Sequence, residues 1–236
     1  MNEGQEAIMA FPRRLETELL DVLPADDPAA IRSRRDLKLL NAVMLHPAMM
    51  ARRLRRLATA PPKRIVELGA GDGSLMLRLA RRLAPHWPGV ATVLVDQQSI
   101  VPATTRAEIN DLGWRQEQVA QDVFAYLAAA KPADIIIANL FLHHFESPQL
   151  SEILARSAAL APAFVALEPR RAALPLLGSR MIWLLGCNHV SRHDASASVR
   201  AGFRGRELSA LWPDLKGWSL HEGPAALSHG FTARKC

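Results

Sequence analysis

Cysteine and long apolar runs are scarce in this sequence of 236 residues. The two cysteines, Cys187 and Cys236, have neither metal-ligand spacing nor the pattern of a disulfide framework, so no metal site and no disulfide-stabilised fold are predicted. No apolar run reaches the roughly 20 residues that cross a bilayer. The first residues also lack the basic start and apolar core of a secretory signal. We therefore expect a cytoplasmic protein without a membrane span.

Acidic residues are outnumbered by basic ones, 23 against 29, which gives a formal net charge of +6 and a pI near 10.0. Such a balance can indicate a nucleic-acid partner. Many of the cations, however, stand beside apolar residues at helical spacing, as in ARRLRRLA over residues 51–58. A solvated helix face is therefore favoured, and a nucleic-acid groove remains the alternative. The abundance of alanine and arginine matches the coding bias of GC-rich bacteria.

A chain of 236 residues is long enough for one α/β domain with an added segment. Residues 1–60 have no strand signals, and their apolar periodicity predicts three helices. The first carries the apolar stripe that starts at Leu15 and ends at Pro24. The second begins after Asp27 as N-cap, and the third covers residues 48–57. We predict an N-terminal helical cap over 1–60 and a core domain over 61–236, with a substrate-side insertion at about 172–204.

The most informative stretch is KRIVELGAGDGSLMLRLARRL, which covers residues 63–83. A short apolar run up to Leu68 predicts a buried strand, and leucines at helical spacing after residue 74 predict an amphipathic helix. Between them lies a glycine-rich turn over residues 69–73. Its glycines allow positive φ angles and close approach of a ligand, and the following helix N-terminus favours electron-rich groups.

The turn reads GxGxG with an acid two residues before it, which departs from the GxGxxG dinucleotide fingerprint. It resembles motif I of the class I S-adenosylmethionine-dependent methyltransferases, because Glu67, Gly69, Gly71 and Gly73 match that motif position by position. The resemblance implies S-adenosylmethionine as the cofactor. It also implies that the turn, with Ala70, cradles the methionine part and that Glu67 organises it. A glycine turn that serves packing alone is the alternative.

Further cofactor residues are expected at the ends of the next strands. The strand over residues 91–96 ends in Asp96 and Gln97, and a carboxylate there can accept hydrogen bonds from both ribose hydroxyls. In the family, an acid after the third strand commonly meets the adenine amino group. Asp122, followed by Val123, fills that place, although it could equally be the N-cap of the next helix. The fourth strand, over residues 134–139, runs into Asn139 and Leu140, which we expect to face the transferring methyl group.

A fifth strand over residues 163–168 and a closely spaced pair over 218–222 and 228–233 complete the prediction. The pair is expected to be antiparallel, as in the ending of class I methyltransferases. We therefore predict an α/β fold with a Rossmann-like, seven-stranded, mostly parallel sheet whose last strand is antiparallel, plus the N-terminal helical segment.

Candidates for acid–base chemistry follow the fourth strand and recur in the polar stretch 186–200. The run NLFLHHF over residues 139–145 resembles the corresponding segment of small-molecule methyltransferases, and no proline follows Asn139 as in enzymes that methylate base nitrogens. A neutral imidazole near the methyl group can hold the proton of an acceptor. We single out His144 and His193, and then His143, for this role.

These observations predict a methyltransferase that O-methylates a small aromatic or polyketide-like acceptor by in-line transfer. The stretch 189–208 supports this acceptor class, because it resembles a segment of bacterial methyltransferases thought to act on aromatic polyketide products. An RNA methyltransferase is the alternative, and a cofactor-binding protein without catalysis is a third. A nicotinamide reductase is the least favoured class, since the turn lacks GxxxGxG or GxGxxG spacing and the single tyrosine, Tyr126, has no lysine four residues later. The sequence does not predict the acceptor or the oligomeric state.

Overall fold

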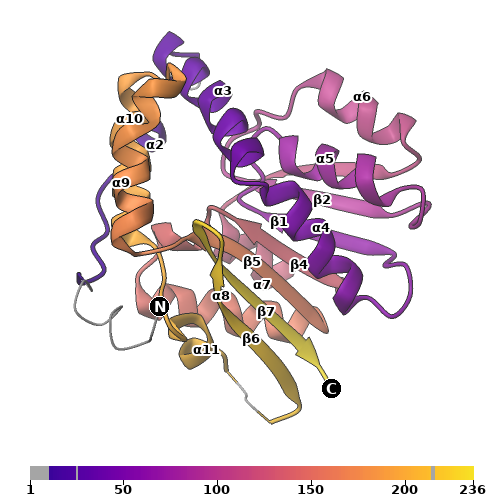
Figure 1. The fold of residues 1–236 in the computed structure, drawn as a ribbon. Helices are drawn as coiled ribbons and strands as arrows, with labels where there is room; N and C mark the ends of the chain where they lie inside the picture. Colours follow the sequence, from indigo (N-terminus) through magenta and orange to yellow (C-terminus); the bar gives the residue numbers. More distant parts are fainter. Residues whose placement is uncertain (1–10, 25, 214–215) are drawn as a thin grey trace.

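A computed structural model describes residues 11–24, 26–213 and 216–236 (Figure 1). The first ten residues, in which no secretory signal is predicted, lie outside the described part. Seven strands form one sheet: β1 Arg64–Leu68, β2 Ala91–Asp96, β3 Arg115–Ala120, β4 Ile135–Asn139, β5 Ala163–Pro169, β6 Trp218–Ala225 and β7 Ser228–Lys235. Their order is β3-β2-β1-β4-β5-β7-β6, and β7 runs antiparallel to both its neighbours while β1 to β5 are parallel. The predicted fold class is confirmed.

Alternate side chains of the buried strands enter two hydrophobic cores, one on each face of the sheet. On one face, Ile65 of β1 packs with α4 (His46–Leu57), α5 (Ser74–Leu83) and α6 (Ala103–Asp111). On the other, Val66 and Leu68 pack with α7 (Val123–Ala129), α8 (Ser147–Leu160) and α11 (Glu207–Leu211). Strands covered on both faces need continuous apolar sequence, which is why β1, β2 and β4 were recognisable.

A third group of helices stands beside the sheet as a column (Figure 1). It contains α2 (Leu19–Val22), α9 (Ala173–Met181), the 3-10 segment η2 (Ile182–Leu185) and α10 (His189–Ala201), with α3 (Pro28–Val43) leaning on α10. The polar stretch 186–200 therefore forms mostly helix α10, whose N-cap Asn188 accepts a hydrogen bond from the Ser191 amide at 2.9 Å. Within the described ranges no helix is long and apolar enough to span a bilayer.

The predicted second and third helices are present as α3 and α4, and Asp27 accepts the Ala29 amide at 2.7 Å as expected of an N-cap. The first helix is wrong in extent, because only Leu19–Val22 is helical. Residues 11–18, which we call the N-terminal strap, have no regular secondary structure. The division of the chain at residue 60 stays a prediction.

Tertiary hydrogen bonds explain why the strap is not helical. The Arg13 side chain donates to the carbonyls of Ala201 at 2.7 Å and Phe145 at 2.8 Å, so it joins the strap to two other parts of the chain. The carboxylate of Asp194 accepts from the amides of Leu19 at 2.7 Å and Leu20 at 3.0 Å. The Asp194 bonds occupy the first amides of α2, so the helix starts at Leu19 and does not extend back to Leu15. The Arg13 bonds hold the strap in a non-helical path against the local apolar periodicity.

His46 links α4 to β7 and makes the fold acid-sensitive. Its side chain is fully buried, and its Nε2 lies 2.6 Å from the Ser228 hydroxyl. Burial lowers the pKa of His46 from 6.5 to about 4. The unfolded chain therefore binds a proton that the folded chain does not, so the stabilisation is complete above pH 6.5 and is lost as the pH falls towards 4.

We expect His46→Gln, which cannot titrate, to flatten this dependence. Between neutral pH and pH 4, urea unfolding of the wild type should lose on the order of 3 kcal/mol more than that of the variant. His221→Gln removes an exposed histidine on β6 and should follow the wild type. Parallel pH profiles for His46→Gln and the wild type would contradict this role for His46.

Candidate active site

A cavity of about 460 Å³ opens at the carboxyl ends of the parallel strands, the expected place for a ligand in such sheets. It collects most of the residues singled out from the sequence: Glu67, Gly69, Ala70, Gly71, Asp96, Gln97, Val123, Asn139, Leu140, His143 and His144. Three further candidates, Gly73, Asp122 and His193, are not among its lining residues. One site thus unites side chains from four separate stretches of the chain.

The glycine-rich turn between β1 and α5 needs its glycines for two different reasons. Gly69 and Gly71 have φ angles of +67° and +53°, which residues with a Cβ rarely adopt. A Cβ on Gly69 would lie 2.1 Å from the Phe141 ring, whereas a Cβ on Gly71 would meet no atom of the described residues within 4 Å. Gly69 therefore permits close packing of the turn on the loop after β4, and Gly71 leaves open space beside the cavity.

Asp96, at the end of β2, ties this turn in place. One oxygen of its carboxylate accepts the Gly71 amide at 2.9 Å, and the other accepts the Gln98 amide at 2.9 Å. A carboxylate oxygen has two lone pairs, so each oxygen can accept one further hydrogen bond. Asp96 can thus hold the turn and still bind a pair of ligand hydroxyls in the cavity.

The buried carboxylate of Glu67 is the strongest indication that the cavity binds a ligand. Glu67 is 2% exposed, and one oxygen of its carboxylate, Oε2, has no hydrogen-bond partner in the part of the chain that the structure describes. Burial, followed by the negative charges of Asp72 and Asp96, raises the pKa of Glu67 well above its usual value. A ligand that brings a positive charge or several N–H donors would satisfy this buried acceptor. The ammonium group of S-adenosylmethionine fits that requirement.

Asp122 is placed as the N-cap of α7. Its carboxylate accepts the amides of Phe124 at 2.9 Å and Ala125 at 3.2 Å, and it also accepts from the side chain of Gln97 at 3.3 Å. The capping role considered for this residue is therefore observed, and its contact with the adenine amino group stays a prediction. Its neighbours Gln97 and Val123 line the cavity, and Asp122 holds the first of them in position.

The opposite wall of the cavity is formed by the loop after β4, which contains the 3-10 segment η1 (Leu142–His144). Leu140 starts this loop with a φ of +52°, an uncommon conformation for a residue with a side chain. Glu168, fully buried in β5, accepts the amides of Phe141 at 3.1 Å and Leu142 at 2.9 Å. The loop is thus built around a single buried carboxylate.

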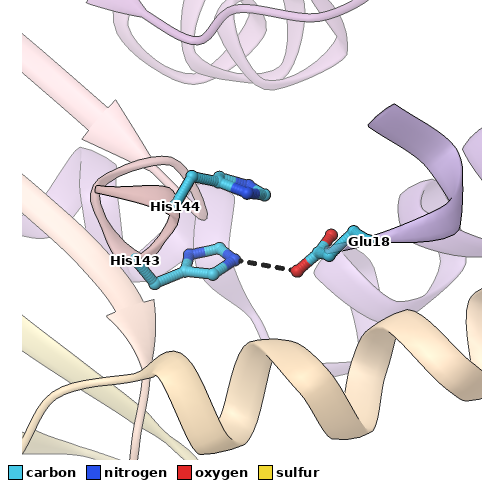
Figure 2. A group of neighbouring side chains, drawn as sticks. All are labelled: Glu18, His143 and His144. Atoms are coloured by element: carbon cyan, nitrogen blue, oxygen red, sulfur yellow. Dashed lines mark hydrogen bonds and ion pairs between the residues drawn. The ribbon is translucent and has the colours of Figure 1, made fainter. Parts of the chain in front are cut away.

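His143 lies between two carboxylates, Glu168 and Glu18, of which Figure 2 shows Glu18. Its Nδ1 is 2.8 Å from Glu168 and its Nε2 is 3.2 Å from Glu18 of the strap. Burial by itself lowers the pKa of His143, but the hydrogen bonds to Glu168 and Glu18 outweigh this effect and raise it to about 9.

The ring of His144 lies 4.2 Å from that of His143, centroid to centroid. Burial and the charge of His143 lower the pKa of His144 to about 4. A charged and a neutral imidazole therefore stand side by side.

His193 does not join this pair. Its side chain is 47% exposed on α10, and its Nδ1 lies 2.9 Å from Asp194, whose carboxylate also holds the start of α2. Glu18 and Glu168, by contrast, contact His143 directly, and neither was among the candidates. Glu168 at the end of a strand was a visible signal. Nothing in the sequence indicated Glu18, which is 125 residues away from His143.

The fold and the site define a class I S-adenosylmethionine-dependent methyltransferase architecture. Residues 45–174, more than half of the chain, match the family described as "Methyltransferase domain", and the chain belongs to this family. It is also 33% identical over 106 residues to the ribosomal protein L11 methyltransferase of Rhodopseudomonas palustris (strain BisB5). That match covers 43% of this chain and 35% of the length of that curated relative.

Solved structures of similar fold include the plantazolicin methyltransferase BpumL in complex with SAH, with a TM-score of 0.65, 13% identity, and 89% of this chain and 92% of that chain covered. An O-methyltransferase family protein from Burkholderia thailandensis has a TM-score of 0.61 at 18% identity, over 89% and 61% of the two chains. The magnesium protoporphyrin IX methyltransferase of Synechocystis PCC 6803 with bound SAH has a TM-score of 0.54 at 14% identity, over 92% and 91%.

Proposed function

We propose that this protein uses S-adenosylmethionine to O-methylate a small aromatic or polyketide-like acceptor. The observation that carries the proposal is the composition of one cavity. The glycine turn, Glu67 and Asp96 lie at one side, and an imidazole pair lies on the loop after β4. The structurally similar proteins include complexes with SAH and an O-methyltransferase family protein, which supports the same proposal.

Each part of the cofactor has a partner in this arrangement. The residues of the turn, Gly69, Ala70 and Gly71, hold the methionine part with Glu67 as partner of its ammonium group. Asp96 binds the ribose hydroxyls, and Gln97 and Val123 flank the adenine. Bound there, S-adenosylmethionine supplies a methyl group on a cationic sulfur, and transfer forms a bond from that carbon to the acceptor oxygen as the carbon–sulfur bond breaks.

The acceptor side combines apolar walls with one neutral imidazole. Phe141, Phe145 and Leu140 line the cavity beside His144, and they offer the flat apolar contacts that an aromatic ring needs. His144 is neutral above about pH 4, so it can hold the proton of a hydroxyl group. The apolar stretch 172–185 exposes Leu174 and Trp183 on the surface and contributes no lining residue to the cavity, so its apolar walls come from the loop after β4.

Methyl-labelled S-adenosylmethionine tests this function. Purified protein is incubated with the labelled cofactor and, in separate reactions, with a panel of phenols and aromatic acids or with total RNA. The proposal expects label in an ether-extractable product of at least one phenol or acid. Label in RNA alone would overturn it in favour of the RNA alternative. Saturable cofactor binding with no transfer in any reaction would favour the third hypothesis, a binding protein without catalysis.

One surface feature keeps an RNA methyltransferase as the second candidate. A groove of about 690 Å³ is lined by the cations Arg52, Arg53 and Arg56 of α4 and Arg234 and Lys235 of β7. Because Arg234 pairs with Ala163, the first residue of β5, this groove lies at the sheet edge where the parallel strands begin. The cofactor cavity lies at the other edge. Because these cations lie far from the site of methyl transfer, they do not support an RNA acceptor. The small-molecule acceptor is therefore favoured.

A further inference from the structure

We propose that Glu18, His143 and His144 form a binding site for a divalent first-row transition ion such as Zn²⁺ at the acceptor end of the cavity. All three side chains line the cavity, and they come from the strap and from the loop after β4 (Figure 2). The sequence predicted no metal site because its cysteines lack ligand spacing. The folded chain builds this cluster from residues that are distant in sequence.

The spacing of the donor atoms fits a metal site. One nitrogen from each histidine and one carboxylate oxygen of Glu18 all lie within 4.8 Å of one another. His143 Nε2 and Glu18 Oε1 are 3.2 Å apart. Ligand atoms around a tetrahedral Zn²⁺ with bonds of about 2.0–2.1 Å are separated by about 3.3 Å. His143 Nε2 and Glu18 Oε1 already have this separation. A shift of about 1.5 Å in the most distant of the three donor atoms would bring all three to the separation of zinc ligands.

The surroundings of His143 are those of a metal ligand. Glu168 accepts the Nδ1 hydrogen at 2.8 Å, which directs Nε2 towards Glu18 and the cavity. Metal-ligating histidines characteristically donate their second N–H to a carboxylate in this way. Glu168 is itself fixed by the amides of Phe141 and Leu142, and the Ser198 hydroxyl donates to Glu18. Two of the three ligands are therefore oriented before an ion arrives.

The chemical nature of the three ligands also determines which class of metal ion this site prefers. Two imidazoles and one carboxylate suit Zn²⁺, Fe²⁺ and related ions better than Mg²⁺ or Ca²⁺, which prefer oxygen ligands. Three protein ligands leave at least one coordination position open towards the cavity. Binding displaces the hydrogen between His143 and Glu18, and that proton passes to solvent.

The ion would act on the acceptor. With an ion bound, His144 serves as a ligand and no longer holds the proton of the acceptor. A hydroxyl that reaches the open position instead loses its proton to water, because the positive charge stabilises the oxygen anion. The oxygen keeps the electron pair that forms the new bond to carbon. This use of the ion rests on the proposed function, whereas the binding of the ion does not.

The test measures Zn²⁺ binding to the untagged, metal-free chain by equilibrium dialysis and elemental analysis. Cys236→Ser serves as the background, because its exposed thiol could bind zinc on its own. We expect one ion per chain, and Glu18→Gln and His144→Ala, each made in that background, should weaken binding at least tenfold. His221→Ala, which removes an exposed histidine outside this cavity, is the matched control and should bind like the background.

Less than half an ion per chain, or equal affinity in all the variants, would overturn the metal site. Circular dichroism of each variant establishes that the fold is retained, and Glu18→Gln preserves the size of the side chain if His144→Ala does not fold. Titration of the same samples with S-adenosylhomocysteine separates the two proposals. Zinc binding without S-adenosylhomocysteine binding contradicts the proposed function and leaves the metal site standing.

Discussion

Replacing Asp96 by asparagine is expected to weaken S-adenosylhomocysteine binding about thirtyfold. The amide keeps one oxygen that can accept the Gly71 amide, so the turn remains in place. It loses the charge and one acceptor for the ribose hydroxyls, and a hydrogen bond to a charged group contributes about 2 kcal/mol. Isothermal titration of the two proteins measures the difference.

Asp111→Asn provides the control for this substitution. Asp111 is exposed at the end of α6 and does not line the cavity, so the same change there should leave the affinity within about twofold of the wild type. Equal affinities for Asp96→Asn and Asp111→Asn would contradict the assignment of the ribose site to the end of β2.

The Glu168→Gln variant is expected to lose about 3 kcal/mol of unfolding free energy. The carboxylate is fully buried and accepts from three backbone amides and from the His143 ring, whose pKa it raises together with Glu18. Removing one charge of a buried pair costs about 3–5 kcal/mol, and the isosteric amide, together with Glu18 as the second carboxylate beside His143, limits the loss to the lower end. For a chain of this size the melting temperature should fall by about 6–12 °C.

Glu152→Gln makes the same chemical change on the surface of α8. Glu152 forms an exposed pair with Arg156 at 2.7 Å, one helical turn away, and such pairs contribute less than about 0.5 kcal/mol. Thermal denaturation of the two variants therefore isolates the effect of the buried site. If Glu168→Gln melts within a degree or two of Glu152→Gln, Glu168 does not organise the loop after β4.

Most of the sheet could be predicted from the sequence because its strands are covered on both faces. The continuous apolar residues of β2, and the acid that ends it, were visible without the structure, and Asp96 does line the cavity. The glycine turn was equally visible, since positive φ angles at Gly69 and Gly71 require glycine. Positive φ angles and burial each restrict which residue types can occupy a position, so both can be recognised in the sequence.

The acceptor end of the site was harder to predict because long-range contacts build it. The stripe that includes Leu15 and Leu19 has helical spacing, yet hydrogen bonds from Arg13 and to Asp194 hold the strap in a non-helical path. That path brings Glu18 to His143. Sequence patterns report periodicity within one element, and they carry no information on which distant side chain completes a cluster.

The histidines illustrate the same limit. His144 and His193 were preferred to His143 in the sequence, and only the placement of α10 separates His193 from the other two. Their environments then give His143 and His144 opposite pKa shifts, because one has two carboxylate partners and the other lies beside that charged ring. Neither shift follows from the adjacent positions of the two residues in the chain.

A crystal structure of the complex with S-adenosylhomocysteine tests the central claim most directly. We predict that the amino acid part lies against residues 69–73 with its ammonium group on Glu67. The ribose should lie on Asp96, and the sulfur should face Asn139 and His144. A ligand bound in the groove between α4 and β7, or one in the cavity with its sulfur directed away from the loop after β4, would contradict the account.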